Sequence, residues 1–268
     1  QELYLTDTAI DNEGLPALAG LRKLRLLDLG LTAVGDAGLA HLKTLSGLEE
    51  LVLIGTRVGD EGLKALADMP LQTLILTGCE ITDDGLPQLA GLKHLRHLEL
   101  QQCHIRGAGL KALAGLTQLE VLDLTDTSLN DDGLAHIKSL TGLVELSMSN
   151  TRIGDAQLKA LEPLGKLEAL AVGGTRIGDD GLAEIGKLST LRALMLNATK
   201  IGDDGLAHLK GLKKLQALSL QNTSITDAGL KHLTGMKHLN SISVSETKIT
   251  DAGIKALQEK LPHVKIVR

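Results

Sequence analysis

Two adjacent carboxylates lie between glycines in the segment TRIGDDGL, residues 175–182. Asp179 and Asp180 could supply oxygen ligands to a calcium ion, because flexible glycine-containing loops rich in carboxylates bind calcium in many proteins. Such a site needs about six to eight oxygen atoms that converge on one point. The segment therefore raises the question whether an ion or the fold itself explains these residues.

The same segment returns along the whole chain. Related octapeptides begin at residues 8, 32, 56, 79, 103, 127, 151, 175, 199, 223 and 247, which are 24 residues apart except for one step of 23. A fixed period of this length is typical of a solenoid, in which each repeat forms one layer. The carboxylates are then spread one per layer, so we interpret them as structural and predict no metal site.

Each repeat can be written L-x-x-L-x-L-x-x-T-x-I-x-D-x-G-L-x-x-L-x-x-L-x-x, and residues 21–44 are a good example. The alternation of Leu27 and Leu29 predicts a short strand with one buried face. The apolar spacing after Asp36 predicts a short helix or helical turn, and an Asp at its start can cap it by accepting a hydrogen bond from an N–H group of the first turn. The same position holds Asn12 in the first repeat, Gly107 in the fifth, and otherwise Asp36, Asp60, Asp83, Asp131, Asp155, Asp179, Asp203, Asp227 and Asp251.

A column of threonines marks the point where each strand turns away. We expect their hydroxyl groups to bond the backbone of the next layer and form a ladder. Cys79 and Cys103 occupy this column, which indicates two buried, reduced thiols. A disulfide between them stays open, because neighbouring layers lie about 4.8 Å apart. No C-x-x-C spacing indicates zinc or redox chemistry.

These units resemble leucine-rich repeats, specifically a 24-residue bacterial type with Thr in place of the usual Asn, and the phrase ITDxGL is similar to the cysteine-containing repeats of F-box substrate receptors. The resemblance covers essentially the whole chain. It implies an α/β fold, a curved solenoid with a parallel sheet on the concave face and short helices or helical turns on the convex face. It also implies protein recognition as the usual function. We expect residues 1–268 to form a single solenoid of about eleven repeats, with residues 258–268 as a C-terminal capping strand.

Composition narrows the classes of partner. The chain has a net charge of −5, no Trp, no Phe and the single aromatic Tyr4, which argues against nucleic acid because no aromatic platform is available for stacking. Residues 1–134 carry 20 acidic and 10 basic side chains, whereas residues 135–268 carry 13 and 18. This separation could steer a partner or drive self-association, although drift in solvated faces is the simpler explanation.

No apolar run approaches the roughly 20 residues of a membrane span, so we expect no membrane insertion. No signal peptide opens the chain, which starts at Gln1 inside a repeat; we therefore expect a soluble piece of a longer protein, and its compartment stays open. Nucleotide-binding, zinc-protease and hydrolase motifs are missing from the sequence. We predict a protein that is not an enzyme and needs no cofactor.

The strand residues between the leucines should face outward on the concave side. There, Leu26, Leu31, Val52, Ile54 and Ile75 gather in the second to fourth repeats, which indicates a contact site, although scattered aliphatic residues that favour strands explain them equally well.

Glu99 and Asp123 should lie side by side in adjacent layers, with His97 and Glu145 nearby. We interpret this acidic pair as an anchor for a basic side chain of a partner. Plain solvated acids, and a metal or catalytic acid–base site, stay open as alternatives.

The predicted concave contact surface therefore consists of Tyr4, Leu26, Asp28, Leu31, Val52, Ile54, Ile75, His97, Glu99, Asp123, Glu145 and Met195. A secondary basic stripe, Arg152, Arg176 and Lys200, either neutralises the neighbouring Asp residues or binds an acidic partner. The sequence thus favours a recognition scaffold that binds a protein on its concave face. The alternative is a structural spacer or self-associating rod.

Overall fold

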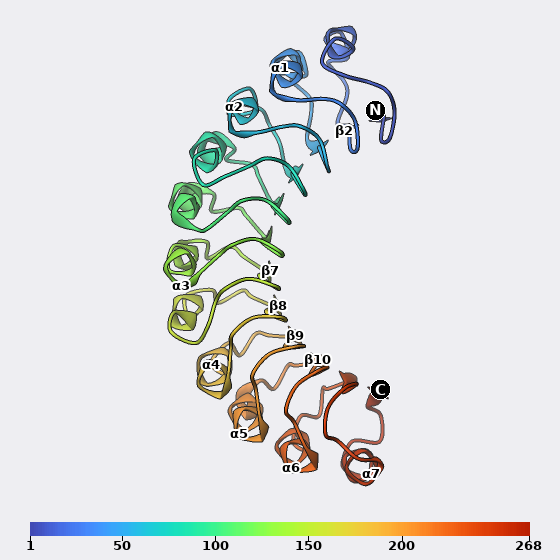
Figure 1. Cartoon of the computed structure of the whole chain (residues 1–268), viewed down its shortest axis with the longest axis vertical. Helices are drawn as coiled ribbons and strands as arrows, with labels where there is room; N and C mark the ends of the chain where they lie inside the picture. The colour runs from blue at the N-terminus through green and yellow to red at the C-terminus, as the bar shows by residue number, and fades with distance from the viewer. The chain divides into compact units, whose positions relative to one another are not determined.

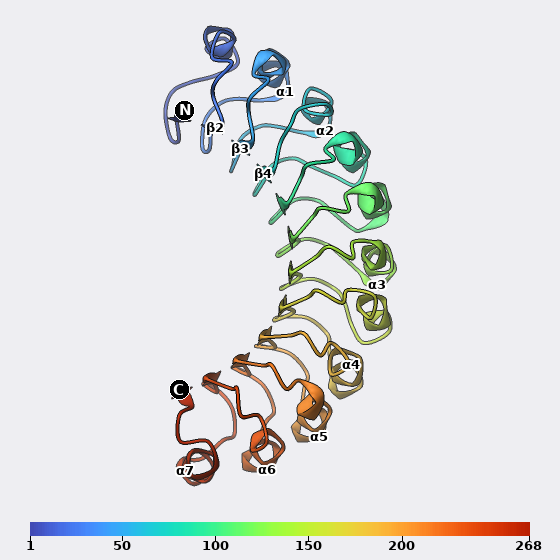
Figure 2. The same cartoon turned by 180° about the vertical axis from the view of Figure 1, so that it is seen from behind.

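The computed structural model describes all 268 residues and divides into two units, residues 1–129 and 130–268. Both units are stacks of one kind of layer, in which a short strand leads through a turn into a short helix and back (Figure 1). Within each unit, the strands line the concave side and the helices line the convex side (Figure 2). This arrangement confirms the predicted leucine-rich-repeat solenoid.

Every strand is three residues long and pairs in parallel with its neighbours in the unit. In unit 1 the order is β1 (Glu2–Tyr4), β2 (Leu26–Asp28), β3 (Glu50–Val52), β4 (Thr73–Ile75), β5 (His97–Glu99) and β6 (Val121–Asp123). In unit 2 it is β7 (Glu145–Ser147), β8 (Ala169–Ala171), β9 (Ala193–Met195), β10 (Ala217–Ser219), β11 (Ser241–Ser243) and β12 (Lys265–Val267). The register follows the repeat, so equivalent residues of successive layers lie opposite one another.

The convex sides carry short α-helices and 3₁₀ helices (η). Unit 1 has η1 (Leu15–Leu18), α1 (Asp36–Leu39), η2 (Ala40–Thr44), α2 (Asp60–Leu63), η3 (Leu86–Gly91) and η4 (Ala108–Gly115). Unit 2 has α3 (Asp131–Leu134), η5 (Ile137–Ser139), η6 (Leu158–Leu161), α4 (Asp179–Ile185), α5 (Asp203–Leu206), η7 (Ala207–Gly211), α6 (Asp227–Leu230), η8 (Lys231–Leu233) and α7 (Asp251–Lys260). Residues 258–260 thus belong to α7, and the strand at the C-terminal end is limited to β12.

The core of each layer is built from aliphatic residues. In the second layer Leu27, Leu29, Leu39 and Leu42 are all 0% exposed. Identical layers need one side-chain shape that stacks on itself, and leucine supplies it. Burying such a side chain fully stabilises the fold by about 1.5–3 kcal/mol.

The aspartate column corrects one prediction. The N-cap of α1 is Gly35, and Asp36 is the first helical residue with no side-chain bond to its own turn. Instead, Asp36 Oδ1 accepts a hydrogen bond from the N–H of Gly59 in the next layer at 2.7 Å. Equivalent bonds join Asn12 to Gly35, Asp60 to Thr82, Asp83 to Gly107, Asp131 to Gly154, Asp155 to Gly178, Asp179 to Gly202, Asp203 to Thr226 and Asp227 to Thr250. These side chains fasten their layers to the ones that follow and form a ladder between layers, which is interrupted where Gly107 occupies the position.

The threonine column corrects a second prediction. Thr32 Oγ1 donates to the carbonyl of Leu29 in its own layer at 2.6 Å, and Thr175 does the same to Val172 at 2.6 Å. The hydroxyl groups therefore close the turn after each strand. The role that we assigned to threonine belongs to the aspartates.

The residue before each threonine has a left-handed backbone in every layer. Glycine, asparagine and aspartate tolerate this conformation, whereas other residues are strained in it by about 1–2 kcal/mol. Most of these positions hold a tolerant residue, but Leu31, Gln102, Ala198 and Glu246 have φ values of 55°, 58°, 54° and 56°. These residues keep a conformation that their side chains disfavour.

Candidate functional site

The strand face of unit 1 displays the columns that the repeat predicts. Tyr4 lies opposite Asp28, Val52 lies opposite Ile75, and Glu99 lies opposite Asp123. The middle residue of each strand from β2 onward is buried, which leaves its two neighbours on the surface. The register thus gathers side chains from six layers on one face.

An apolar cluster lies at the second to fourth layers of this face. Leu31 is 57% exposed and Ile54 is 38% exposed, whereas Leu26, Val52 and Ile75 are half-buried. A Cβ atom on Gly55 would meet Leu31 Cδ2 at 2.9 Å, so the leucine side chain lies against the next layer. Two of the five aliphatic residues are therefore exposed and three are half-buried on these layers.

The acidic pair has its own hydrogen-bond partners. His97 Nε2 lies 2.8 Å from Glu99 Oε1, and Gln101 Nε2 donates to Asp123 Oδ2 at 2.7 Å. The N–H of Thr125 donates to the other oxygen of Asp123 at 2.8 Å. No group of three or more His, Cys, Asp and Glu side chains in the chain is placed to hold a metal ion. The two carboxylates are instead fixed in place as hydrogen-bond acceptors.

Tyr4 and Asp28 extend the face toward the first layer. Tyr4 is 60% exposed, and its hydroxyl donates to Glu2 Oε2 at 2.8 Å. This hydrogen bond to a carboxylate raises the pKa of Tyr4 above its usual value, with smaller contributions from other nearby acids. Asp28 Oδ1 accepts a hydrogen bond from the N–H of Gly30 at 2.8 Å. The face combines apolar side chains with carboxylates throughout unit 1.

Basic residues near this face are already paired with acids. Arg25 contacts Glu49 at 2.5 Å, and Arg96 contacts Glu120 at 2.5 Å. The bond to Arg25 lowers the pKa of Glu49. No Lys or Arg side chain pairs with Asp28, Glu99 or Asp123 within 4.0 Å; His97 is the partner of Glu99.

The strand face of unit 2 has a different character. Its predicted contact residues are Glu145, which is exposed, and Met195, which is 44% exposed. Most of the other outward residues of β8 to β11 are Ala or Ser. Met195, Ala217, Ser219 and Ser243 line a shallow hollow of about 200 Å³. This face is smooth and offers few groups that a partner could bind.

The basic stripe also lies in unit 2. Arg152, Arg176 and Lys200 are exposed, and none of them pairs with an acid within 4.0 Å. Arg152 and Arg176 line a hollow together with Asp131 and Asp132. The basic stripe therefore forms no direct ion pairs with the ladder carboxylates and can act on their charge only over distances beyond 4.0 Å.

Cys79 and Cys103 are buried free thiols, as the sequence predicts. The Sγ of Cys79 donates to the carbonyl of Leu53 at 3.0 Å, and that of Cys103 donates to Leu76 at 3.2 Å. Both acceptors lie in the preceding layer, unlike those of the threonines. Burial raises the pKa of Cys79 and raises that of Cys103 to about 12, so both thiols stay protonated and unreactive at neutral pH.

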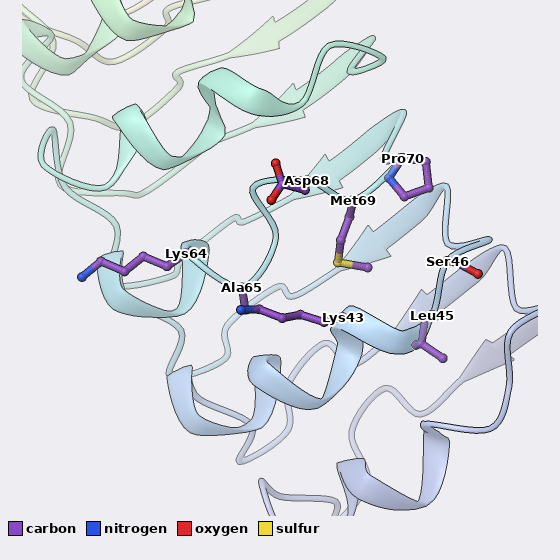
Figure 3. Close-up of a pocket in the computed structure, with 8 residues that line it drawn as sticks. All are labelled: Lys43, Leu45, Ser46, Lys64, Ala65, Asp68, Met69 and Pro70. Carbon is purple, nitrogen blue, oxygen red and sulfur yellow. The ribbon is translucent and has the colours of Figure 1, made fainter.

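A hollow of about 470 Å³ opens on the helix side of unit 1 (Figure 3). It lies at the 23-residue repeat, where Met69 and Pro70 stand in place of the longer segment around Gly47. A Cβ atom on Gly47 would lie 2.8 Å from the carbonyl of Arg22, which shows how closely this segment packs in the complete layer. The hollow therefore lies where this repeat is one residue shorter than the others. Of its two lysines, Lys64 is already paired with Glu61 at 2.6 Å.

The longest helix, α7, has ten residues, and no helix combines the length and apolar character that crossing a bilayer requires.

Comparisons with known proteins agree with this architecture. The sequence profile described as Leucine Rich repeat matches residues 47–67, 68–90, 91–114, 166–186 and 235–257. No curated protein matches the chain.

Solved structures share the fold at low sequence identity. An internalin (inlF) from Listeria monocytogenes has a TM-score of 0.76 at 23% identity, and the match covers 99% of this chain and 79% of the internalin. The LRR protein LIC12759 of Leptospira interrogans has a TM-score of 0.74 at 22% identity, with 94% and 62% covered. The plant peptide hormone receptor RGFR1, in complex with RGF2, has a TM-score of 0.62 at 17% identity, with 99% and 47% covered. The chain thus spans less than two thirds of the last two proteins.

The profile matches fall in both units, and the solved structures share the architecture of the layers. The chain has the leucine-rich-repeat solenoid fold, and five of its segments match the leucine-rich-repeat profile.

Proposed function

We propose that this chain is a non-enzymatic recognition scaffold that binds a protein partner on the strand face of unit 1. One observation carries the proposal: this face exposes Leu31 and Ile54 beside carboxylates that no Lys or Arg neutralises. Apolar side chains can supply affinity, and the carboxylates favour a partner with basic groups. The expected partner is a protein surface that is both apolar and basic.

The backbone of Leu31 supports this proposal. A bulky residue in the left-handed conformation costs about 1–2 kcal/mol, and strained residues of this kind cluster at binding sites. Leu31 is nevertheless the most exposed aliphatic residue of the cluster. A contact with a partner would explain why a leucine occupies a position that favours glycine or asparagine.

The rigidity of the sheet also favours recognition. Each strand is paired in parallel with the strands beside it. The carboxylates of Asp28 and Asp123 accept hydrogen bonds from the backbone N–H groups two residues later in the chain. A preorganised surface loses little conformational entropy when it binds. Among the structural relatives, the plant receptor RGFR1 was solved in complex with RGF2, which supports a polypeptide partner for a fold of this kind.

The test compares, by affinity capture, which proteins are retained by the native chain and by two matched variants of it. The first variant carries Val52→Arg, Ile54→Arg, Glu99→Lys and Asp123→Lys in unit 1. The second carries Ser219→Arg, Gln221→Arg, Ala171→Lys and Ser147→Lys at outward positions of unit 2. Circular dichroism and urea unfolding establish that all three chains fold equally well.

A protein retained by the native chain and the unit 2 variant, but lost by the unit 1 variant, supports the proposal and identifies the partner. Retention by both variants contradicts it and moves the contact away from the strand faces. Loss with the unit 2 variant alone contradicts it as well.

A structural spacer or self-associating protein is the second candidate, and the charges of the two units favour it. Unit 1 has 18 acidic and 10 basic side chains, and unit 2 has 15 acidic and 18 basic. Opposite charges would attract between copies at low ionic strength. Sedimentation velocity at low and high salt tests this candidate: oligomers that dissociate as salt rises support it, and a monomer under both conditions contradicts it.

A further inference from the structure

The last helices of unit 2 and the turns that follow them carry a group of cations that form no ion pair. Residues 205–245 contain five lysines and only one acidic residue, Asp227. All five lysines are exposed, and none forms an ion pair within 4.0 Å. Some cations of the chain are paired, such as Lys64 with Glu61 and Lys187 with Glu184. We define the basic face as Lys210, Lys213, Lys214, Lys231, Lys237 and Lys260.

The repeat places several of these cations at equivalent positions of consecutive layers. Lys213 and Lys237 occupy the same turn, in which each N–H donates to the glycine two residues earlier. Lys214 and His238 follow them in the same order. Like charges in neighbouring layers repel one another, so this arrangement opposes folding when no anion is present. An anionic partner would remove that repulsion.

A hollow of about 310 Å³ opens between α6, η8 and α7, where Lys231 and Lys260 of the basic face lie. The buried side chains of Leu230 and Leu257 contribute its lining, and the small residues Ala252 and Ala256 leave it unfilled. Lys231 and Lys260 also line it, and both are exposed at its rim. The hollow is therefore apolar inside and positively charged at its rim.

Asp227 is the one acid in this lining, and it is already used by the layer ladder. Its two carboxylate oxygens accept hydrogen bonds from the N–H of Thr250 at 2.8 Å and from Thr250 Oγ1 at 2.6 Å. These hydrogen bonds, and more weakly the charges of Arg268 and Lys231, lower the pKa of Asp227. Asp227 forms no ion pair with Lys231 within 4.0 Å. The two lysines of the lining outnumber its one acid.

We propose that the basic face binds an acidic peptide segment that places one apolar side chain in this hollow and its carboxylates at the lysines. The charge of the face requires an anion, and the apolar lining requires an apolar group beside it. A free phosphate lacks the apolar group, and a nucleic acid would find no aromatic side chain for stacking in unit 2. This site is independent of the strand face of unit 1.

The probe is a fluorescein-labelled peptide made of three Glu-Glu-Leu-Glu repeats, titrated with the whole chain by fluorescence anisotropy. A second peptide has Ser in place of each Leu. We expect the Leu peptide to bind about 10-fold more tightly, because one leucine side chain loses most of its contact with water in the hollow. We also expect the affinity to fall as salt rises.

Two variants of unit 2 separate charge from shape. The double substitution Lys231→Glu and Lys260→Glu reverses the charge of the rim. It is expected to lower the affinity for the Leu peptide by about 10-fold or more. Ala256→Leu fills the hollow on an exposed helix position and is expected to abolish the difference between the two peptides. Lys43→Glu with Lys64→Glu, at the hollow of unit 1, is the matched control and should leave both affinities unchanged.

Several outcomes overturn the proposal. They are equal binding of the two peptides to the native chain, no effect of the rim reversal, or no binding of the Leu peptide at about 1 mM. Vesicles with one-third phosphatidylserine and inorganic polyphosphate are included as competitors, and stronger binding of either one assigns the face to phosphate groups instead. Unfolding curves that match those of the native chain show that each variant is folded.

Discussion

Units 1 and 2 have the same core and opposite surfaces. Leu51 in unit 1 and Leu194 in unit 2 are both 0% exposed at the middle of a strand. Beside such leucines, however, unit 1 has Val52 and Ile54 where unit 2 has Ser219 and Gln221. The comparison shows that the repeat dictates the inward residues of a layer and leaves the outward residues free to differ.

The units also differ in how regular their layers are. Unit 1 contains both cysteines, the 23-residue repeat and Gly107 in place of an aspartate, whereas the aspartate and threonine columns of unit 2 are complete. The strands of unit 1 nevertheless keep the register of the repeat. The layer therefore tolerates local exceptions without a change in the sheet.

The largest effect on stability is expected when a core side chain is removed from each unit. Leu51→Ala and Leu194→Ala should each lower the free energy of unfolding by about 2–5 kcal/mol, because each leaves a cavity in a closely packed layer. Urea denaturation followed by circular dichroism measures both values. A difference of more than about 2 kcal/mol between them would show that the two cores are not equivalent.

A smaller effect is expected from the aspartate ladder. Asp36→Ala in unit 1 and Asp155→Ala in unit 2 each remove the acceptor of an N–H group in the next layer, at 2.7 and 2.9 Å. Each substitution should lower the free energy of unfolding by about 1–2 kcal/mol. Asp180→Ala is the control, since Asp180 is exposed and lies outside the ladder; a loss as large as that of Asp155→Ala would contradict the ladder interpretation.

The residue with the left-handed backbone can be replaced by glycine in each unit, and the two substitutions should differ in their effect on binding. Leu31→Gly in unit 1 and Ala198→Gly in unit 2 should each raise the free energy of unfolding by about 1 kcal/mol, because glycine relieves the strained backbone. Only Leu31→Gly should weaken binding of the partner that the native chain captures. Equal capture by both variants would remove Leu31 from the contact surface.

The thiols of unit 1 should make the stability of the chain depend on pH in the alkaline range. Their pKa values are raised in the folded chain, to about 12 for Cys103, so their contribution to stability is complete below the ordinary pKa near 9 and is lost as pH rises toward 12. The native chain should therefore lose more stability between pH 8 and 10.5 than a variant with Cys79→Thr and Cys103→Thr. Parallel urea midpoints for the two chains would contradict the assigned burial of the thiols.

The sequence predicts the fold well because the period of 24 residues aligns equivalent positions. It places Glu99 opposite Asp123 and brings Val52 next to Ile75, and the structure shows both pairs. It also predicts two buried cysteines. These features depend on which residues align, and the repeat alone determines that.

The directions of the polar side chains could not be predicted in this way. Thr32 can reach either the carbonyl three residues earlier or the next layer, and the period does not distinguish the two. Asp36 is the first residue of α1 and not its N-cap, and its Oδ1 accepts the N–H of Gly59 in the next layer. The left-handed column was missed, although Gly55, Asn150 and Gly174 at that position are a recognisable signal.

The aspartate ladder has a direction, because a layer with an aspartate at this position presents an acceptor to the layer that follows. If one such repeat is removed or inserted, the acceptor of one layer still meets an equivalent N–H donor in the next. The chain can therefore change its length by whole layers through recombination between repeats, with no compensating substitution at the junction. New binding faces can then evolve by copying a layer first and altering its outward residues later.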